Sequence, residues 1–169
     1  MKNSKIIVKT KSKSYPIYFG DKILSHVPTL VKKNIPGAKK ILIISDKNLP
    51  SSLLRKFIKS LKKYKPKIYK LSSNEKIKSF KIANKLIERV LENNLSRSDC
   101  IIALGGGIIS DLTAFVASLT KRGIKLINIP TTLLAQVDAS IGGKTGINSS
   151  KGKNLIGTFY QPDFVLIDI

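Results

Sequence analysis

Residues 100–111 read CIIALGGGIISD, a run of apolar residues that passes directly into three glycines and then into a helical pattern. A continuous apolar run of this kind is typical of a strand buried on both faces of a parallel sheet. The glycines at 105–107 permit a tight turn, and the helix after them would present its positive end to a phosphate group. The spacing Gly105-x-Gly107-x-x-Ser110 resembles a dinucleotide-binding fingerprint whose last glycine is replaced, which alone is a weak indication.

Outward from this stretch, short apolar strands alternate with amphipathic helical segments. The strands that we expect are residues 5–10, 15–19, 41–44, 67–71, 100–104 and 124–129. The helical segments that we expect are residues 21–33, 49–63, 76–93 and 107–120. This alternation predicts an α/β fold, Rossmann-like, in which a mostly parallel sheet carries helices on both faces. The length of 169 residues fits one domain, residues 1–169.

Residues 129–154 read IPTTLLAQVDASIGGKTGINSSKGKN and show little hydrophobic period. Hydroxyls, a carboxylate, lysines and glycines gathered after a strand are typical of a polar pocket wall. Ligands of parallel sheets bind beyond the carboxyl ends of the strands, where Asp46, the glycines at 105–107 and the pair Thr131-Thr132 all fall. We therefore expect these three strand ends to meet at one crevice, with Asp46 either holding a ribose hydroxyl or capping the next helix.

Other motifs have ordinary structural explanations beside the functional ones. The spacing of Ser72 and Glu75 matches a capping box, and Asp111 stands where an acidic residue suits the helix dipole or can bind a cofactor. Gly143-Lys144-Thr145 looks like the tail of a P-loop, but the first glycine of that motif would coincide with Asp138. Because a carboxylate in a phosphate-binding loop would repel its ligand, this segment is not expected to belong to a nucleoside triphosphatase.

The formal net charge of +21 lies apart from this chemistry. Residues 1–99 carry 25 basic and 6 acidic side chains, whereas residues 100–169 carry 6 and 4. Only four of the basic residues are arginines, so we expect lysines on solvated helix faces and no specific nucleic-acid binding. No apolar run predicts a membrane span, and the single cysteine, Cys100, fits a reducing cytoplasm. His26 is the only histidine, so a metal site within the chain would need carboxylates to do nearly all the binding, and we expect none.

A set of motifs between residues 105 and 168 resembles the 3-dehydroquinate synthase family in order and spacing. These motifs are GGGIISD at 105–111, KRG at 121–123, PTTLLAQVD at 130–138, SIGGKTGIN at 140–148, GKN at 152–154, Gly157-x-Phe159 and residues 162–168. Asn74-Glu75-x-x-Lys78 is similar to a Gly-Glu-x-x-Lys segment of that family, with asparagine in place of glycine. The resemblance places the chain among the sugar-phosphate cyclases, which share a domain plan with the iron-dependent alcohol dehydrogenases.

The resemblance implies an NAD-dependent lyase of the shikimate pathway of aromatic amino acid biosynthesis. Such an enzyme converts 3-deoxy-D-arabino-heptulosonate 7-phosphate to 3-dehydroquinate and phosphate. By match to the family, the residues that would bind NAD are Glu75, Lys78, Gly105, Gly106, Gly107, Asp111, Thr131, Thr132 and Lys153. Asp46 joins them from its place at a strand end. The residues that would bind substrate and act in catalysis are Arg122, Asp138, Lys144 and Asn154.

The same resemblance implies parts that this chain lacks. The family's C-terminal helical domain supplies Glu-His-His ligands to a divalent metal, zinc or cobalt, and this chain is about half of the family's length. We therefore expect a cofactor-binding half that is inactive alone, with a C-terminal-half chain or a second copy as possible partners. Another sugar-phosphate cyclase and a metal-dependent polyol dehydrogenase stay open as alternatives. A basic nucleic-acid-binding relic without catalysis is a further alternative from another class.

Overall fold

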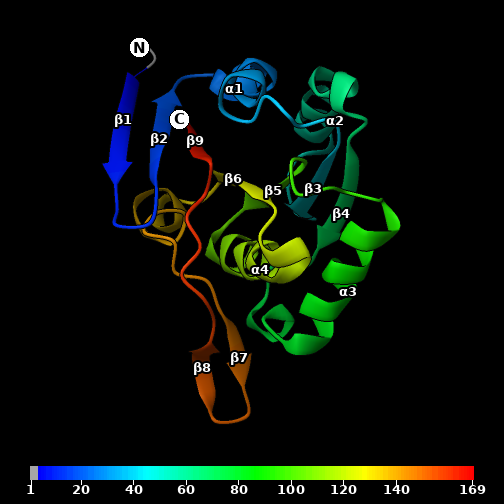
Figure 1. Cartoon of the computed structure of the whole chain (residues 1–169), viewed down its shortest axis with the longest axis vertical. Coiled ribbons are helices and arrows are strands. Elements are labelled where there is room, and N and C mark those ends of the chain that lie inside the picture. The colour runs from blue at the N-terminus through cyan, green and yellow to red at the C-terminus, as the bar shows by residue number, and fades with distance from the viewer. Residues whose placement is uncertain (1–3) are drawn as a thin grey trace.

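A seven-stranded sheet, with strand order β1-β2-β9-β6-β5-β3-β4, forms the centre of the computed structural model, which describes residues 4–169 (Figure 1). The strands are β1 (Ser4–Lys9), β2 (Ser14–Gly20), β3 (Ile41–Asp46), β4 (Lys67–Leu71), β5 (Cys100–Gly105), β6 (Lys125–Pro130) and β9 (Phe164–Asp168). β1 pairs antiparallel with β2, and each of the other pairings is parallel. The predicted mostly parallel sheet is therefore confirmed.

Helices cover both faces of the sheet, as predicted. They are α1 (Val27–Asn34), α2 (Ser51–Ser60), α3 (Phe80–Glu92) and α4 (Gly107–Leu119). The side chains of β5 alternate between two cores: Ile101 and Ala103 pack with α3 and α4, whereas Ile102 and Leu104 pack with α1 and α2. These four side chains are fully buried, and each large one contributes about 1.5–3 kcal/mol by leaving water.

The carboxyl ends of three neighbouring strands lie side by side. Gly105 at the end of β5 pairs with Pro130 at the end of β6, and Leu104 pairs with Ser45 near the end of β3. The expected adjacency of these strand ends is thus confirmed, whereas the crevice that they were expected to share stays a prediction. The chain leaves each strand at this edge to enter α2, α4 or the polar segment after residue 130.

The helix expected from residue 76 begins later, at Phe80. Glu75–Ile77 form a separate 3-10 turn, η3, and Lys78 leaves it with a non-helical ψ of 70°. The capping-box interpretation of Ser72 and Glu75 is wrong, because the Asn74 side chain accepts the hydrogen bond from the Lys76 backbone N–H at 3.1 Å. This break in the helix frees Glu75 and Lys78 to contact other parts of the chain.

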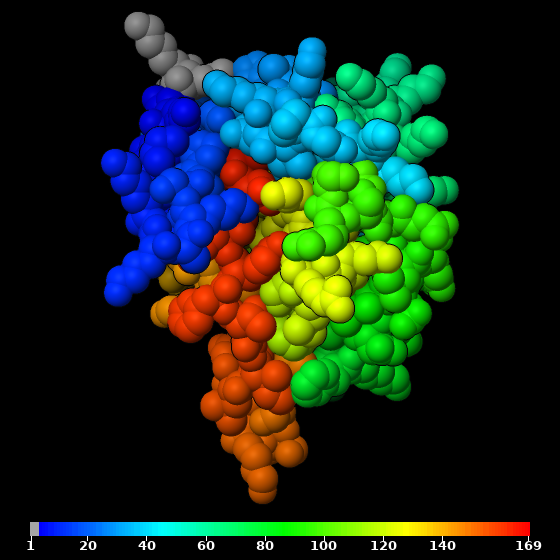
Figure 2. Space-filling view, viewed as in Figure 1, coloured from blue at the N-terminus to red at the C-terminus, as the bar shows by residue number. Residues whose placement is uncertain are grey.

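Two elements of the polar segment were not expected from its sequence. Residues Ala135–Ala139 form a π-helical turn, η5, and a hairpin follows, made of β7 (Ile147–Ser149) and β8 (Gly152–Ile156). The hairpin, orange in Figures 1 and 2, projects from the body of the molecule. Ile147 at its base is fully buried in the α3 and α4 core. The polar wall predicted here is therefore a folded turn and a hairpin.

Candidate functional site

The glycine turn at the end of β5 lies against the threonine pair at the end of β6. The Thr131 backbone N–H donates to the Gly105 carbonyl at 3.0 Å, and a Cβ built on Gly106 would stand 3.2 Å from the Thr132 methyl carbon. Gly106 precedes α4, and no side chain caps the first turn of that helix. Amides without a side-chain cap, at the positive end of a helix and beside hydroxyl groups, suit an anionic ligand such as a pyrophosphate.

Asp46 stabilises the turn at the end of β3. Its Oδ1 accepts a hydrogen bond from the Asn48 backbone N–H at 2.9 Å. α2 begins only at Ser51, and the residue before it is Pro50, so the helix-cap alternative for Asp46 is wrong. The carboxylate stays half-buried at the strand edge near the glycine turn, where a ribose interaction stays a prediction.

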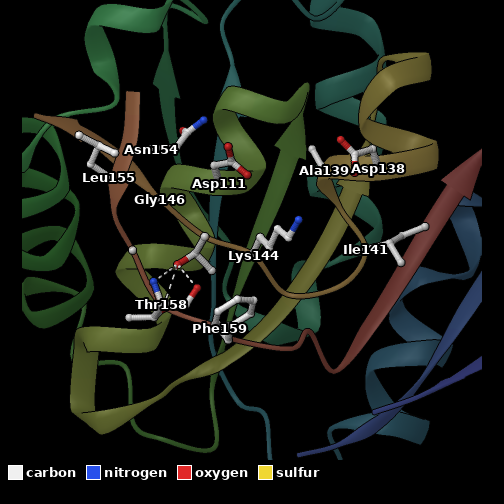
Figure 3. Close-up of a pocket in the computed structure, with 12 residues that line it drawn as sticks. Asp111, Asp138, Ala139, Ile141, Lys144, Gly146, Asn154, Leu155, Thr158 and Phe159 are labelled. Carbon is white, nitrogen blue, oxygen red and sulfur yellow. Dashed lines mark hydrogen bonds between the residues drawn. The ribbon is translucent and has the colours of Figure 1, made fainter. Parts of the chain in front are cut away.

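A cavity of about 480 Å³ lies between α4, η5 and the hairpin. Its charged and amide side chains come from four parts of the chain: Asp111 from α4, Asp138 from η5, Asn154 from β8 and Lys144 from the segment between η5 and the hairpin. In Figure 3 the side chains of the other three lie around Lys144. Its apolar lining includes Leu155 and Phe159, which are 63% and 81% exposed. A lysine among two carboxylates and an amide fits a ligand that carries both hydroxyl groups and an anionic group.

Lys144 lies in residues 140–146, the segment between η5 and β7, which we call the strap. Hydrogen bonds hold the strap against residues 157–159. The Thr145 backbone N–H donates to the Thr158 carbonyl at 3.0 Å, and the Thr158 N–H donates to the Thr145 hydroxyl at 3.0 Å. A Cβ on Gly157 would lie 1.9 Å from the Thr145 carbonyl oxygen, so only glycine fits there. These contacts fix the Lys144 backbone at the cavity wall.

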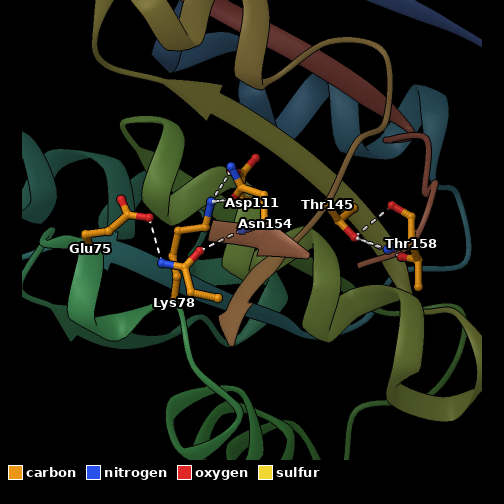
Figure 4. A network of polar contacts seen from close by, with 7 residues as sticks. Glu75, Lys78, Asp111, Thr145, Asn154 and Thr158 are labelled. Atoms are coloured by element: carbon orange, nitrogen blue, oxygen red, sulfur yellow. Dashed lines mark hydrogen bonds and ion pairs between the residues drawn. The ribbon is translucent and has the colours of Figure 1, made fainter. Parts of the chain in front are cut away.

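Lys78 is the centre of a polar network that reaches the cavity (Figure 4). Its side chain is only 4% exposed, and its ammonium donates to the Asp111 carboxylate at 2.7 Å and to the Asn154 side-chain oxygen. Asn148, which was not among the predicted site residues, donates through Nδ2 to the Glu75 carboxylate at 2.7 Å. The signal available for Asn148 was its place inside the matched SIGGKTGIN motif.

The pKa of Asp111 is raised above its ordinary value. Partial burial is the main cause, and the nearby carboxylates of Glu75 and Asp138 act in the same direction. The hydrogen bond and positive charge of Lys78 oppose them. The site thus gathers negative charge around one buried ammonium, which makes a bound cation or a hydrogen-bond donor favourable beside Asp111.

The structure does not bring every predicted residue to the cavity. Arg122 is exposed as the last residue of the short turn η4 (Thr120–Arg122), at the far end of α4, and does not line the cavity. α4 separates it from Asp111, so its role in binding substrate stays a prediction. Lys153 is exposed on β8 and does not line the cavity that its neighbour Asn154 lines. Glu75 and Lys78 line a second, open cavity of about 640 Å³ at the hairpin.

Residues 4–169 contain neither a metal-binding cluster nor a membrane-spanning helix. No three His, Cys, Asp or Glu side chains among them lie close enough together to hold a metal ion. No helix in this part of the chain is both long and apolar enough to cross a membrane.

The family model for the 3-dehydroquinate synthase N-terminal domain matches residues 68–169, which include the glycine turn, the cavity and the hairpin. The chain belongs to the 3-dehydroquinate synthase family. A 3-dehydroquinate synthase of Pelagibacter ubique is 46% identical over 97% of this chain, and one of Helicobacter pylori is 44% identical over 97%. The chain spans 45% of the length of each of these relatives.

Solved structures support the same assignment of the fold. A 2-deoxy-scyllo-inosose synthase, crystallised with carbaglucose-6-phosphate, NAD+ and Co2+, superposes with a TM-score of 0.89 at 28% identity, over 98% of this chain and 46% of its own. A 2-epi-5-epi-valiolone synthase from Streptomyces hygroscopicus, with NAD+ and Zn2+ bound, gives a TM-score of 0.80 at 26% identity, over 96% of this chain and 45% of its own. A probable glycerol dehydrogenase from Sinorhizobium meliloti, at 17% identity, shares the fold alone.

Proposed function

We propose that this chain is the NAD-binding part of a 3-dehydroquinate synthase, which converts 3-deoxy-D-arabino-heptulosonate 7-phosphate to 3-dehydroquinate and phosphate. The observation that carries this proposal is the meeting of Asp111, Asp138, Lys144 and Asn154 at one cavity beside the glycine turn. Relatives named 3-dehydroquinate synthase are 46% and 44% identical to the chain, whereas the related cyclases are 28% and 26% identical. This difference favours the synthase over another sugar-phosphate cyclase.

The glycine turn and the neighbouring threonine pair at the sheet edge suit NAD. Gly105, Gly106 and Gly107 with the first amides of α4 would hold the pyrophosphate, and Thr131 and Thr132 would donate hydroxyl hydrogen bonds beside it. Asp46 would accept from a ribose hydroxyl, while Glu75, Lys78, Asp111 and Lys153 complete the proposed set. When bound, NAD+ supplies the chemistry of taking up a hydride from a ring carbon and returning it.

The cavity side chains suit a polyhydroxylated sugar phosphate. Lys144 would pair with an anionic group of the substrate and stabilise the charge that develops as phosphate leaves. Asp138 would accept hydrogen bonds from substrate hydroxyls, and the Asn154 amide can both donate and accept. Arg122 is exposed at the end of α4. To bind substrate, it would have to contact either a substrate that extends to this end of the helix or the cavity of a second copy of the chain.

The rest of the enzyme would cover the open side of this cavity. Large apolar side chains stand exposed on the segments that line it. They are Leu133, Leu134 and Val137 in the segment that leads into and forms η5, and Leu155 and Phe159 on and after β8, and we call these five the apolar rim. Together with the 45% coverage of the relatives, this rim supports a partner region that packs on it and contributes the divalent metal ligands. The described residues do not fit a zinc or cobalt site, so we assign no step of the reaction to a metal here. We place the activity in the cytoplasm, where the buried thiol of Cys100 would stay reduced.

Calorimetric titration of NAD+ into the 169-residue chain tests the cofactor proposal. We expect saturable binding that is abolished by Gly106→Val, because a side chain at Gly106 would crowd Thr132 and block the turn. Gly106 has a φ of −77°, which any residue adopts, so the loss would reflect side-chain volume and not backbone strain.

Gly37→Val is a matched control for this titration. A Cβ on Gly37 would also stand 3.2 Å from its nearest neighbour, the Ser98 side chain, but in the loop before β3 at the opposite edge of the sheet. We expect this variant to retain the affinity for NAD+. No binding by the unaltered chain, or equal losses in both variants, would contradict the assignment of the glycine turn.

A further inference from the structure

Asn148 closes a ring of hydrogen bonds between the hairpin and the segment that follows η3. Its backbone N–H donates to the Lys78 carbonyl at 2.8 Å, and its Oδ1 accepts from the Asn154 backbone N–H at 2.9 Å. The Asn154 side-chain oxygen in turn accepts from the Lys78 ammonium. Lys78 is therefore joined in a closed loop of contacts to two residues of the hairpin that lie far from it in sequence, and the Asn148 side-chain Nδ2 in addition holds Glu75.

The hairpin projects from the body of the molecule (Figure 1), and the ring of hydrogen bonds joins it to the segment after η3. Ile147 anchors its base by burial, but Asn154 stands on the second strand, exposed, with a left-handed φ of 56°. Asparagine tolerates that conformation better than most residues. The hydrogen bond from the Asn154 N–H to the Asn148 Oδ1 adds a contact that holds it there.

We propose that Asn148 is a positioning residue that sets Asn154 at the substrate cavity and couples it to Lys78 and Glu75 on the cofactor side. The proposal rests on the function proposed above for what these three side chains face. Since Lys78 bonds both Asp111 and Asn154, a ligand that changes the cofactor side will change the order of the hairpin, and the reverse holds by linkage.

Hydrogen exchange of the hairpin amides tests Asn148 without any ligand. In Asn148→Ala we expect exchange in residues 147–156 to accelerate about tenfold, because the variant loses two side-chain hydrogen bonds while β5 keeps its protection. Asn93→Ala is the matched control: its side chain also makes a hydrogen bond, to the Arg89 carbonyl at 2.7 Å, but at the end of α3. We expect this control to leave the hairpin unchanged.

Exchanging the amide and the carboxylate between positions 148 and 75 separates positioning from simple packing. Asn148→Asp alone would set a carboxylate against Glu75, so hairpin protection should fall as in the alanine variant. Adding Glu75→Gln supplies an amide donor to the new carboxylate and should restore the protection to within about twofold of the unaltered chain. Unchanged exchange in Asn148→Ala, or no recovery in the double variant, would overturn the proposal.

NAD+ then distinguishes this inference from the proposed function. In the unaltered chain, saturating NAD+ should slow exchange of residues 147–156 further, and Asn148→Ala should reduce that slowing. If the unaltered chain binds no NAD+ but the ligand-free exchange follows the pattern above, the proposed function fails while the positioning role of Asn148 stands.

Discussion

The Lys78 ammonium lies 2.7 Å from the Asp111 carboxylate and thereby joins the segment after η3 to the first turns of α4. Lys78 is nearly buried, whereas Asp111 keeps 23% of its side chain exposed. A buried ammonium is stable as a cation only while a carboxylate or another acceptor stays within reach. The pair therefore contributes to folding as well as to the proposed cofactor site.

Asp111→Asn should lower the free energy of unfolding by about 2 kcal/mol. This value lies below the 3–5 kcal/mol typical of breaking a fully buried ion pair, since water reaches Asp111. Urea unfolding measures it. Asp21→Asn serves as the control, because the Asp21 carboxylate lies 3.9 Å from the exposed Lys22 ammonium; its effect should stay within about 0.5 kcal/mol. Equal effects of the two variants would refute the contribution of the Lys78 contact.

Gly157→Ala should destabilise the strap that carries Lys144. The new Cβ would lie 1.9 Å from the Thr145 carbonyl oxygen, a backbone atom that no rotamer change can move. We expect a loss of about 3 kcal/mol, at the upper end for overpacking. Gly142→Ala is the comparison: it faces open space but has a φ of 84°, so strain alone should cost about 1 kcal/mol. Thermal unfolding of both variants measures the difference.

Asp99 should make stability depend on pH in the acid range. Burial raises the pKa of Asp99, but hydrogen bonds from the Ser96, Lys39 and Lys40 backbone N–H groups and from the Ser96 hydroxyl outweigh it, so the net pKa is lowered. A carboxyl whose folded pKa is below its unfolded value stabilises the fold above the unfolded pKa, and this stability is lost as pH falls through the folded pKa.

Asp99→Asn tests this linkage. At about pH 7 the variant should be less stable by about 1.5–3 kcal/mol, because an amide cannot accept all four hydrogen bonds. The difference between the two proteins should shrink as the pH falls below about 4, where the carboxyl of the unfolded chain is protonated. A deficit that stays constant across this range would show that Asp99 acts through packing and not through its charge.

Cys100 should react with thiol reagents only when the chain unfolds. Its side chain is fully buried, and burial, with the nearby charges of Asp163 and Asp99, raises the pKa of its thiol. Labelling should therefore be at least about 10³-fold slower than in denaturant. If NAD+ binds the folded chain, a concentration of about 100 times Kd should slow labelling by about 100-fold more. Rapid labelling of the folded chain would contradict the buried position of β5.

The regular part of the fold was predictable because its signals are local. The apolar runs of β3 and β5 and the stripe of Ala83, Leu86 and Val90 on α3 follow from periodicity, which depends on near neighbours in sequence. The adjacency of the ends of β3, β5 and β6 followed from the general property that parallel strands end at one edge. These predictions required no knowledge of contacts between distant residues.

The details of the site were less predictable because distant contacts decide them. Lys78 could not be placed beside Asp111 from spacing, since 33 residues separate them and the break before α3 aims the lysine inward. The hairpin at 147–156 lacks a strong alternating pattern, because only Ile147 at its base is buried. Arg122 was grouped with the substrate-binding residues by motif alone, and the length of α4 places it away from the cavity.

The apolar rim around the cavity and the net charge of +21 act in opposite directions between molecules. An exposed apolar surface, made of Leu133, Leu134, Val137 and Phe159, favours association between copies of the chain. The positive charges of the lysines repel one another and oppose that association. Salt screens the repulsion and leaves the apolar attraction intact. The chain alone should therefore stay dispersed at low ionic strength and self-associate as salt is added, the reverse of a protein held together by ion pairs.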